Sequence, residues 1–361
     1  MPALAVALAT LAFAGCGGGG SDEPVSAQSG QSSGGSATVV LNGSGATFPE
    51  PAYVKWTGEF HESHPNVQVN YQGIGSGGGI EQFTAGVTDF GASDAPMSDD
   101  ELSAAKAKGG DVLHIPTVLG AVVVTYNVKG VDKLKLDGPT LADIFLGTIK
   151  KWNDPKIAAL NSGVSLPDED IKVVHRSDSS GTSFIFTGYL SAVSDAWNSQ
   201  VGQDKAPEWP TGIGGEGNDG VAAAIQQTEG AIGYNELAYA LQNDIHYATM
   251  KNASGEWVDA SLESTTAAAS GVEYPEDLRF SLLNSKSEGA YPIVSATWQL
   301  LWADPAKAGM NAAKAKALVQ FVTWELTTGQ KSAEDLDYAP LPKDLNSLAV
   351  SALNTMTIPG S

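Results

Sequence analysis

The sequence predicts an α/β protein with two lobes joined by a two-strand hinge. Its 361 residues are too many for one ordinary core and suit two domains of common size. From residue 38 onward, short β-forming runs alternate with helical stretches, which is typical of α/β architecture. Two long apolar runs, near 112–128 and near 290–302, bracket the middle of the chain. We therefore expect a discontinuous first domain, with one strand leading into the second domain and one leading back.

The first half of the folded part begins with a strand and a turn over residues 37–49. Aromatic residues at helical spacing then predict a helix over 51–65. The next elements are a strand at 67–74, a helix at 77–86, a short strand at 89–94 and a helix at 98–108 that begins with a capping box. The run at 112–128 is too long for one ordinary strand, so we expect it to leave one domain and enter the other.

The second half repeats this alternation. It contains helices at 140–147 and 154–163, a strand at 171–178, a helix at 181–194, further segments at 219–230 and 231–242, a strand at 291–302 and a long helix at 307–329. We therefore expect residues 38–119 and 292–361 to form the first domain and residues 120–291 to form the second.

The N-terminus has the features of a bacterial lipoprotein signal. Cys16 is the only cysteine, which rules out an intrachain disulfide, and it follows an apolar run that ends in Ala14-Gly15. Small residues before a single cysteine resemble a lipobox, so residues 1–16 are expected to be a signal peptide with Cys16 as the lipidation site. Residues 17–37 are rich in Gly and Ser and predict a flexible tether. The alternative is a buried N-terminal helix with a free core cysteine.

Composition argues against several functions. The chain has 20 Lys+Arg against 41 Asp+Glu, a formal charge of −21, and no basic cluster that could neutralise a row of phosphates, so we expect no nucleic-acid partner. The five histidines lack the spacing of a zinc-protease helix, and there is no G-x-S-x-G nucleophile motif. We expect no metal site, no cofactor and no catalytic residues.

Three helix starts indicate anion binding. They are Thr47-Phe48, the glycine-rich turn 73–78 and Ser180-Gly181-Thr182, and the last follows Arg176 by four residues. Backbone N–H groups at a helix N-terminus favour an anion. For each start taken alone, ordinary N-capping is the alternative. The turn 73–78 also satisfies G-x-G-x-x-G with Asp94 about twenty residues later, a pattern that would suit a dinucleotide enzyme.

Several longer motifs together resemble a known family. They are GSGATFP (43–49), YQGIGSGGG (71–79), DFGASDAPM (89–97), FLGTIKKWNDP (145–155), RSDSSGTSF (176–184), GGEGNDGVAA (214–223), GAIGYNE (230–236) and LDYAPLP (336–342). In this order they resemble the substrate-binding lipoprotein of the bacterial phosphate ABC importer, the PstS family. The resemblance implies a periplasmic-binding-protein fold of type II.

The resemblance also implies a ligand, a set of contacts and a location. Phosphate would be bound between the lobes, with Asp178 positioning Arg176. The residues expected to contact phosphate are Thr47, Phe48, Ser76, Asp94, Arg176, Ser180, Gly181 and Thr182. The expected protein is a monomer outside the cytoplasm, anchored to the cell membrane by lipid, that delivers phosphate to the importer's integral-membrane permease subunits.

Asp94 bears on selectivity. A carboxylate in an anion site repels the ligand unless the ligand brings a proton, as hydrogen phosphate does and sulfate does not. Another protonated oxyanion such as arsenate remains an alternative. A dinucleotide-dependent enzyme, or a phosphatase using Ser180 and Arg176, is the alternative from another functional class.

Overall fold

The computed structural model describes residues 38–358 and 360. The predicted signal peptide, the lipidation site Cys16 and the tether therefore lie outside the described residues. The described residues belong to one structural unit.

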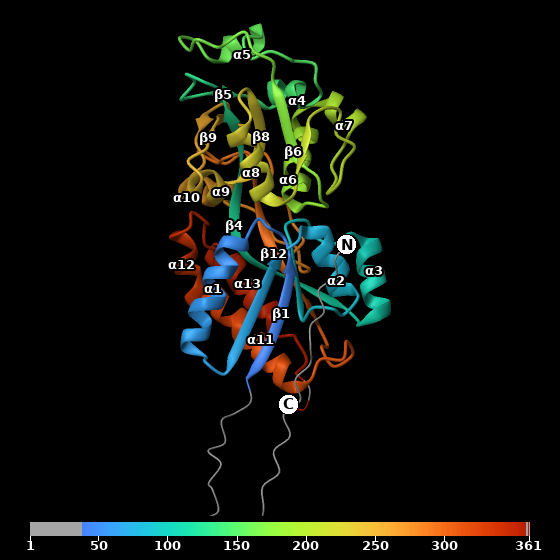
Figure 1. Cartoon of the computed structure of the whole chain (residues 1–361). Coiled ribbons are helices and arrows are strands. Elements are labelled where there is room, and N and C mark those ends of the chain that lie inside the picture. Colours follow the sequence, from blue (N-terminus) through green and yellow to red (C-terminus); the bar gives the residue numbers. More distant parts are fainter. Residues whose placement is uncertain (1–37, 359, 361) are drawn as a thin grey trace, which may run out of the picture. The chain divides into compact units, whose positions relative to one another are not determined.

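A nine-stranded mixed sheet runs through this unit (Figure 1) in the order β2-β1-β3-β12-β4-β8-β6-β7, with β9 also paired to β4. Its strands are β1 (Val39–Gly45), β2 (Val67–Gly73), β3 (Phe90–Ser93), β4 (Val112–Asn127), β6 (Lys172–Arg176), β7 (Ile213–Gly215), β8 (Ala231–Glu236), β9 (His246–Tyr247) and β12 (Val294–Trp302). A separate three-stranded sheet contains β5 (Lys135–Leu136), β10 (Thr249–Lys251) and β11 (Trp257–Val258).

The 16-residue strand β4 connects the two halves of the large sheet. Residues 112–121 pair with β12, and residues 122–127 pair with β8. We call the part with β1, β2, β3 and β12 lobe 1 and the part with β6, β7 and β8 lobe 2. The chain returns to lobe 1 just before β12, where Val122 N donates to Ile293 O at 2.8 Å. This arrangement agrees with the expectation that the long run at 112–128 serves both lobes, while the exact domain boundaries stay a prediction.

Helices cover both lobes (Figure 1). Lobe 1 has α1 (Glu50–Ser63), α2 (Ser76–Thr84), α3 (Asp99–Lys108), α11 (Ala312–Trp324), α12 (Gln330–Glu334) and α13 (Lys343–Leu353), with a π-helix at Glu325–Gly329. Lobe 2 has α4 (Gly138–Phe145), α5 (Pro155–Leu160), α6 (Gly181–Val193), α7 (Asp195–Gln200), α8 (Gly217–Gln227), α9 (Leu237–Gln242) and α10 (Leu262–Ala268).

The segment 231–242, whose type the sequence left open, is a strand followed by a helix, and Glu236 caps that helix, α9, by accepting from Ala238 N. One predicted helix differs from the structure in detail. The long helix predicted over 307–329 begins only at Ala312, where Asn311 caps it, and continues as the π-helix. The predicted capping box of α3 is present, with both reciprocal hydrogen bonds between Ser98 and Glu101.

Strand direction determines where functional groups can meet. β1, β2 and β3 are parallel, and so are β6, β7 and β8. Carboxyl ends of parallel strands share one edge of a sheet, and ligands of open α/β sheets bind outside that edge. Each lobe therefore presents one edge on which the turns after its strands come together.

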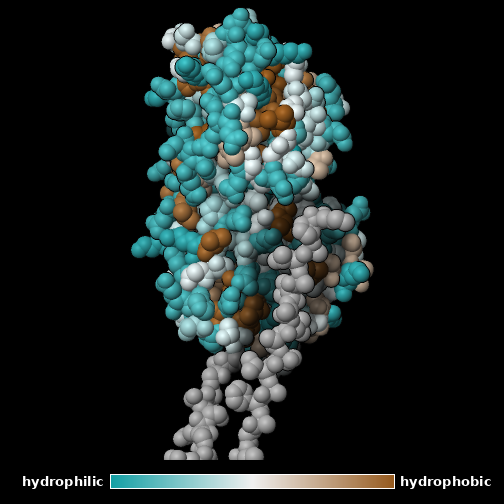
Figure 2. Space-filling model, viewed as in Figure 1, coloured by the Kyte–Doolittle hydropathy of each residue, from teal (hydrophilic) through white to brown (hydrophobic). Residues whose placement is uncertain are grey.

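The surface visible in Figure 2 is mostly hydrophilic, with hydrophobic residues in small separate spots. This agrees with the excess of acidic residues in the sequence. Scattered apolar residues of this kind are normal on a protein surface that faces water.

Candidate anion-binding site

The predicted site residues lie at the carboxyl ends of parallel strands from both lobes. In lobe 1, Thr47 and Phe48 follow β1, Ser76 begins α2 after β2, and Asp94 follows β3. In lobe 2, Arg176 ends β6, and Ser180, Gly181 and Thr182 form the start of α6. All eight are buried, and none of the side chains among them is more than 6% exposed. Sequence motifs far apart along the chain thus meet in one buried region.

Arg176 is the cation of this region. Its guanidinium donates to both carboxylate oxygens of Asp178, from Nε at 2.7 Å and from Nη2 at 2.5 Å. Burial acts to raise the pKa of Asp178, but the hydrogen bonds and charge of Arg176 outweigh it, and the pKa lies below its usual value. This bidentate geometry fixes the guanidinium plane. The third guanidinium nitrogen, Nη1, does not bond Asp178 and donates to Thr182 Oγ1 at 3.2 Å.

The start of α6 supplies backbone donors beside Arg176. Ser180 is the N-cap, and its Oγ accepts from Ser183 N at 3.1 Å. Gly181 and Thr182 are the first two residues of the helix, whose N–H groups have no acceptor within the helix. A side chain at Gly181 would lie against Ser76 and within 2.6 Å of Asp94 Oδ2. Only glycine lets this helix end approach lobe 1 so closely.

Asp94 is the acceptor of this region and is 1% exposed. Thr297 Oγ1 donates to its Oδ1 at 2.8 Å, and Ser76 Oγ lies 3.4 Å from its Oδ2. Burial raises the pKa of Asp94 to about 7, and the hydrogen bond from Thr297, the charge of Arg176 and the hydrogen bond from Ser76 oppose that shift without cancelling it. The carboxyl group can therefore hold or release a proton near neutral pH.

The turn after β1 is held by hydroxyl groups from other elements. Tyr239 Oη donates to Thr47 O at 2.5 Å, and Tyr338 Oη donates to Phe48 O at 2.6 Å. The helix that follows, α1, has no side-chain cap at its N-terminus. Glu50 N donates to Thr47 O at 3.2 Å and Pro51 has no N–H, so the backbone donor expected for a ligand here is Phe48 N, just before the helix.

The glycine-rich turn 73–78 faces the other lobe. Gly77 N donates to Ser179 O at 2.9 Å, and side chains at Gly75 and Gly77 would collide with Asp178 and Ser179. These glycines therefore permit close approach of the loop after β6. The same space is where a pyrophosphate would have to lie in the dinucleotide interpretation, so the geometry disfavours it.

Two residues of this region were not predicted from the sequence. Thr297, in the apolar strand β12, bonds Asp94, and nothing in an apolar run singles out one threonine. Asn218, at the start of α8, donates from Nδ2 to Thr47 Oγ1 at 3.0 Å and to Thr182 Oγ1 at 3.2 Å. Asn218 lies inside the motif GGEGNDGVAA, so the motif marked the place without marking the residue.

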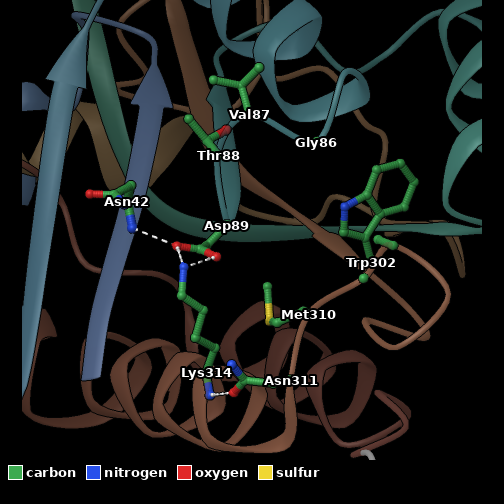
Figure 3. A pocket seen from close by; sticks show the side chains of 11 residues that line it. Asn42, Gly86, Val87, Thr88, Asp89, Trp302, Met310, Asn311 and Lys314 are labelled. Atoms are coloured by element: carbon green, nitrogen blue, oxygen red, sulfur yellow. Dashed lines mark hydrogen bonds and ion pairs between the residues drawn. The ribbon is translucent and has the colours of Figure 1, made fainter. Parts of the chain in front are cut away.

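A cavity of about 290 Å³ lies elsewhere, on lobe 1 (Figure 3). Its charged groups already pair, since Lys314 Nζ lies 2.8 Å from each carboxylate oxygen of Asp89 and Asn42 N donates to the same carboxylate. None of the predicted site residues lines it. We therefore place the candidate site between the lobes and not in this cavity.

Among residues 38–358 and 360, no three His, Cys, Asp or Glu side chains are grouped so that they could hold a metal ion. Over the same described ranges, no helix has the length and apolar character needed to cross a membrane.

Comparison with known proteins identifies the family. The family model described as a PBP superfamily domain matches residues 32–325. The phosphate-binding protein PstS of Xylella fastidiosa is 45% identical over 312 residues, which cover 85% of this chain and 83% of the relative. This chain belongs to the PstS family. A PstS relative from Methanocaldococcus jannaschii is 39% identical over 371 residues, covering 97% of this chain and 93% of the relative.

Solved structures support the same fold. A high-affinity periplasmic phosphate-binding protein bound with phosphate has a TM-score of 0.72 at 21% identity, covering 89% of this chain and 96% of that chain. A phosphate ABC transporter substrate-binding protein from Clostridium perfringens has a TM-score of 0.59 at 18% identity, covering 84% and 100%. The predicted α/β, two-lobed periplasmic-binding-protein fold is confirmed, and the PstS family consists of substrate-binding receptors and not of enzymes.

Proposed function

We propose that this protein is the extracytoplasmic receptor that binds inorganic phosphate and delivers it to an ABC importer in the membrane. Its membership in the PstS family supports this function, because the named relatives are phosphate-binding proteins. The proposed contacts are those named from the sequence, with Asp178 holding Arg176 in place.

The observation that carries the proposal is a single buried acceptor among many donors. Asp94 has a pKa of about 7 and lies beside Ser76 at the start of α2 and Gly181 at the start of α6. The same region holds Arg176 and the hydroxyl groups of Thr47 and Thr182. Such a site fits an anion that carries one proton for Asp94 and offers acceptors everywhere else. Hydrogen phosphate has this pattern near neutral pH, and fully ionised sulfate does not.

The acidic net charge does not prevent this binding. Hydrogen bonds from fixed N–H and O–H groups act over short distances, whereas solvent and salt screen the distant negative field. Charge-assisted hydrogen bonds contribute about 1.5 to 3 kcal/mol each. A handful of them offsets the cost of ordering and desolvation and leaves roughly the −8 kcal/mol of a micromolar complex.

Lobe closure links binding to delivery. Thr47, Ser76 and Asp94 come from lobe 1, whereas Arg176 and the start of α6 come from lobe 2, so only the closed form offers every contact. Phosphate then favours the closed form by its difference in affinity for the two forms. The lobes would correspond to the two predicted domains, and the permease subunits would recognise their closed surface.

The remaining roles follow from this function. A receptor of this kind carries out no chemical step, and it acts as a monomer. Acyl chains on Cys16 would hold it at the outer face of the membrane, with residues 17–37 as the tether.

Isothermal titration of the phosphate-stripped protein with phosphate, arsenate and sulfate near neutral pH tests the proposal. We expect tight one-to-one binding of phosphate, binding of arsenate through the same proton, and no heat with sulfate. A folded sample that does not bind phosphate contradicts the proposed function. Preferential binding of arsenate would assign the site to the alternative oxyanion.

A further inference from the structure

Asn218 occupies a central place in the candidate site without being one of the predicted phosphate contacts. It is fully buried, at the second position of α8 in lobe 2. Its side chain bridges Thr47 of lobe 1 and Thr182 of lobe 2, from Nδ2 at 3.0 Å and 3.2 Å respectively. The amide therefore touches two hydroxyl groups that are expected to contact the ligand.

The orientation of this amide is fixed by the chain around it. Asn218 Oδ1 accepts from Glu236 N at 3.0 Å, so the NH₂ group must point toward the threonines. The backbone of Asn218 is held as well, because its carbonyl accepts from Asn235 Nδ2 at 2.8 Å. Thr125 of β4 in turn donates to Asn235 Oδ1 at 2.9 Å. The amide is locked as a donor toward the site.

This lock determines what the two hydroxyls can do. A hydroxyl has one proton and two acceptor lone pairs. Thr47 Oγ1 accepts from Asn218 N at 3.3 Å as well as from Nδ2, and Thr182 Oγ1 accepts from Arg176 Nη1 as well as from Asn218. Both lone pairs of each oxygen are therefore engaged, and neither hydroxyl donates to another residue in the described part of the chain.

We propose that Asn218 is a specificity-determining positioning residue, which turns the hydroxyl protons of Thr47 and Thr182 toward the ligand. The inference rests on the proposed function and deepens it. With both hydroxyls held as donors, the ligand must offer acceptors on that side and can place a proton only at Asp94. The site thereby selects the protonation state of phosphate as well as its shape.

Replacing the amide of Asn218 by a carboxylate should reverse the direction of the hydrogen bonds made by the two threonine hydroxyls. In Asn218→Asp, the oxygen that replaces Nδ2 accepts the hydroxyl protons of Thr47 and Thr182, so both hydroxyls present lone pairs to the ligand. A ligand with an additional proton, dihydrogen phosphate, then fits better than hydrogen phosphate. The matched control is Asn161→Asp, which introduces the same carboxylate at another buried asparagine, whose side chain bonds Lys135 and Ile157 and none of the site residues.

The experiment is titration of the phosphate-stripped full chain with inorganic phosphate at about pH 6 and at about pH 8. Phosphate changes its protonation between these pH values. We expect Asn218→Asp to weaken phosphate binding at pH 8 by ~10-fold or more, and to raise the affinity at pH 6 relative to that at pH 8 by a similar factor. Asn161→Asp should weaken binding, if at all, by the same factor at both pH values. Parallel pH profiles for the two variants overturn the inference.

A second variant keeps the inference testable if Asn218→Asp does not fold. Asn218→Ala should weaken phosphate binding by roughly 10-fold in the unaltered chain but by less than about 3-fold when Thr47 and Thr182 are both valine. Equal losses in the two backgrounds would show that Asn218 does not act through the threonines. Failure of the unaltered chain to bind phosphate would overturn the proposed function and this inference with it, whereas normal binding with equal losses overturns this inference alone.

Discussion

Asp94 in lobe 1 and Asp178 in lobe 2 are both aspartates near Arg176, yet their pKa values move in opposite directions. Asp178 receives two hydrogen bonds from the guanidinium and another from Gly217 N, and its pKa falls below the usual value despite burial. Asp94 receives bonds from hydroxyls and only the more distant charge of Arg176, and burial raises its pKa to about 7. The difference lies in which carboxylate is paired with the cation.

Two tasks that a carboxylate can perform beside an anion are thus divided between these residues. Asp178 orients the arginine and stays ionised, because direct pairing stabilises its charge. Asp94 has no direct cationic partner and is available to share a proton with a ligand. Substitution of each residue tests this division of roles.

Asp94→Asn should remove the discrimination between phosphate and sulfate. The amide can donate a hydrogen bond where the carboxylate could only accept one, so sulfate no longer meets an unpaired negative charge. We expect the phosphate-to-sulfate affinity ratio to fall by on the order of 10⁴, by analogy with other polar sites that reject a mismatched ligand. Competition titration of sulfate against phosphate measures this ratio.

Asp178→Asn is the matched control for that change, because it alters the other carboxylate beside the same arginine. It should weaken phosphate binding by loosening Arg176 and should leave the ratio close to that of the unaltered chain. If Asp94→Asn kept the original preference for phosphate, Asp94 would not determine selectivity.

The ligand-free protein should lose stability as the pH rises, in part because of Asp94. A carboxyl whose pKa is near 7 when folded and near 3.8 when unfolded holds its proton in the folded state over that interval. The folded state binds more protons there, so the free energy of unfolding decreases from about pH 4 to about pH 7. The contribution from Asp94 is roughly 4 kcal/mol.

Chemical denaturation in phosphate-free buffer across this interval measures the effect. Other buried acids such as Glu236 and Glu325 also have raised pKa values, so the difference between the unaltered chain and Asp94→Asn isolates Asp94. That difference should grow with pH in favour of the variant. Two curves that fall in parallel would contradict a raised pKa at Asp94.

The sequence pointed to both aspartates but did not predict that their pKa values move in opposite directions. Motifs identified Asp94 and Asp178 because each follows a β run in a recognisable stretch. The pKa of each depends on contacts from elements far along the chain, such as Thr297 on Asp94 across 203 positions. Spacing along one strand carries no information about which residues arrive from another.

The fold, too, was predictable in outline but not in every element. The long run at 112–128 indicated a strand shared between the lobes, and the structure pairs it with β12 and then with β8. The division of 231–242 into strand and helix was not predictable, because residues 231–240 are all buried and periodicity does not separate a buried strand from a buried helix. The role of Asn218 was not predictable either, because it depends on hydrogen bonds to Thr47 and Thr182, which lie far from it along the chain.

Gly181→Ala should weaken phosphate binding by moving the start of α6 in lobe 2 away from lobe 1. The added methyl group would lie against Ser76 and within 2.6 Å of Asp94 Oδ2, so α6 could not approach lobe 1 as closely. Relief of this overlap requires a backbone shift that costs about 1–3 kcal/mol, which corresponds to a roughly 10- to 100-fold loss of affinity. Titration with phosphate measures the loss.

Gly58→Ala provides the control for that substitution. Gly58 lies within α1, and apart from adjoining residues and the helix's own backbone no atom lies within 4 Å of the position a Cβ would take there. Phosphate affinity should be unchanged, and stability should be unchanged or slightly higher because alanine favours the helix. Equal phosphate affinity in Gly181→Ala and the unaltered chain would mean that the binding form does not need this close approach.

Lys205→Met should have the smallest effect, because it removes a contact between the lobes that does not involve the ligand. Lys205 Nζ lies 2.5 Å from Glu101 Oε1, and the two side chains are 18% and 27% exposed. Partly exposed ion pairs contribute up to about 1 kcal/mol, so we expect phosphate affinity to fall about 2- to 5-fold, mainly through faster release. Changing Lys205 leaves the capping box that Glu101 forms with Ser98 intact.

Lys106→Met is the control, since Lys106 pairs with Asp111 within lobe 1 and should not affect release. Stopped-flow release rates at low and high salt would distinguish a contact that holds the lobes together from one that does not, because only the former loses its effect as salt screens the pair.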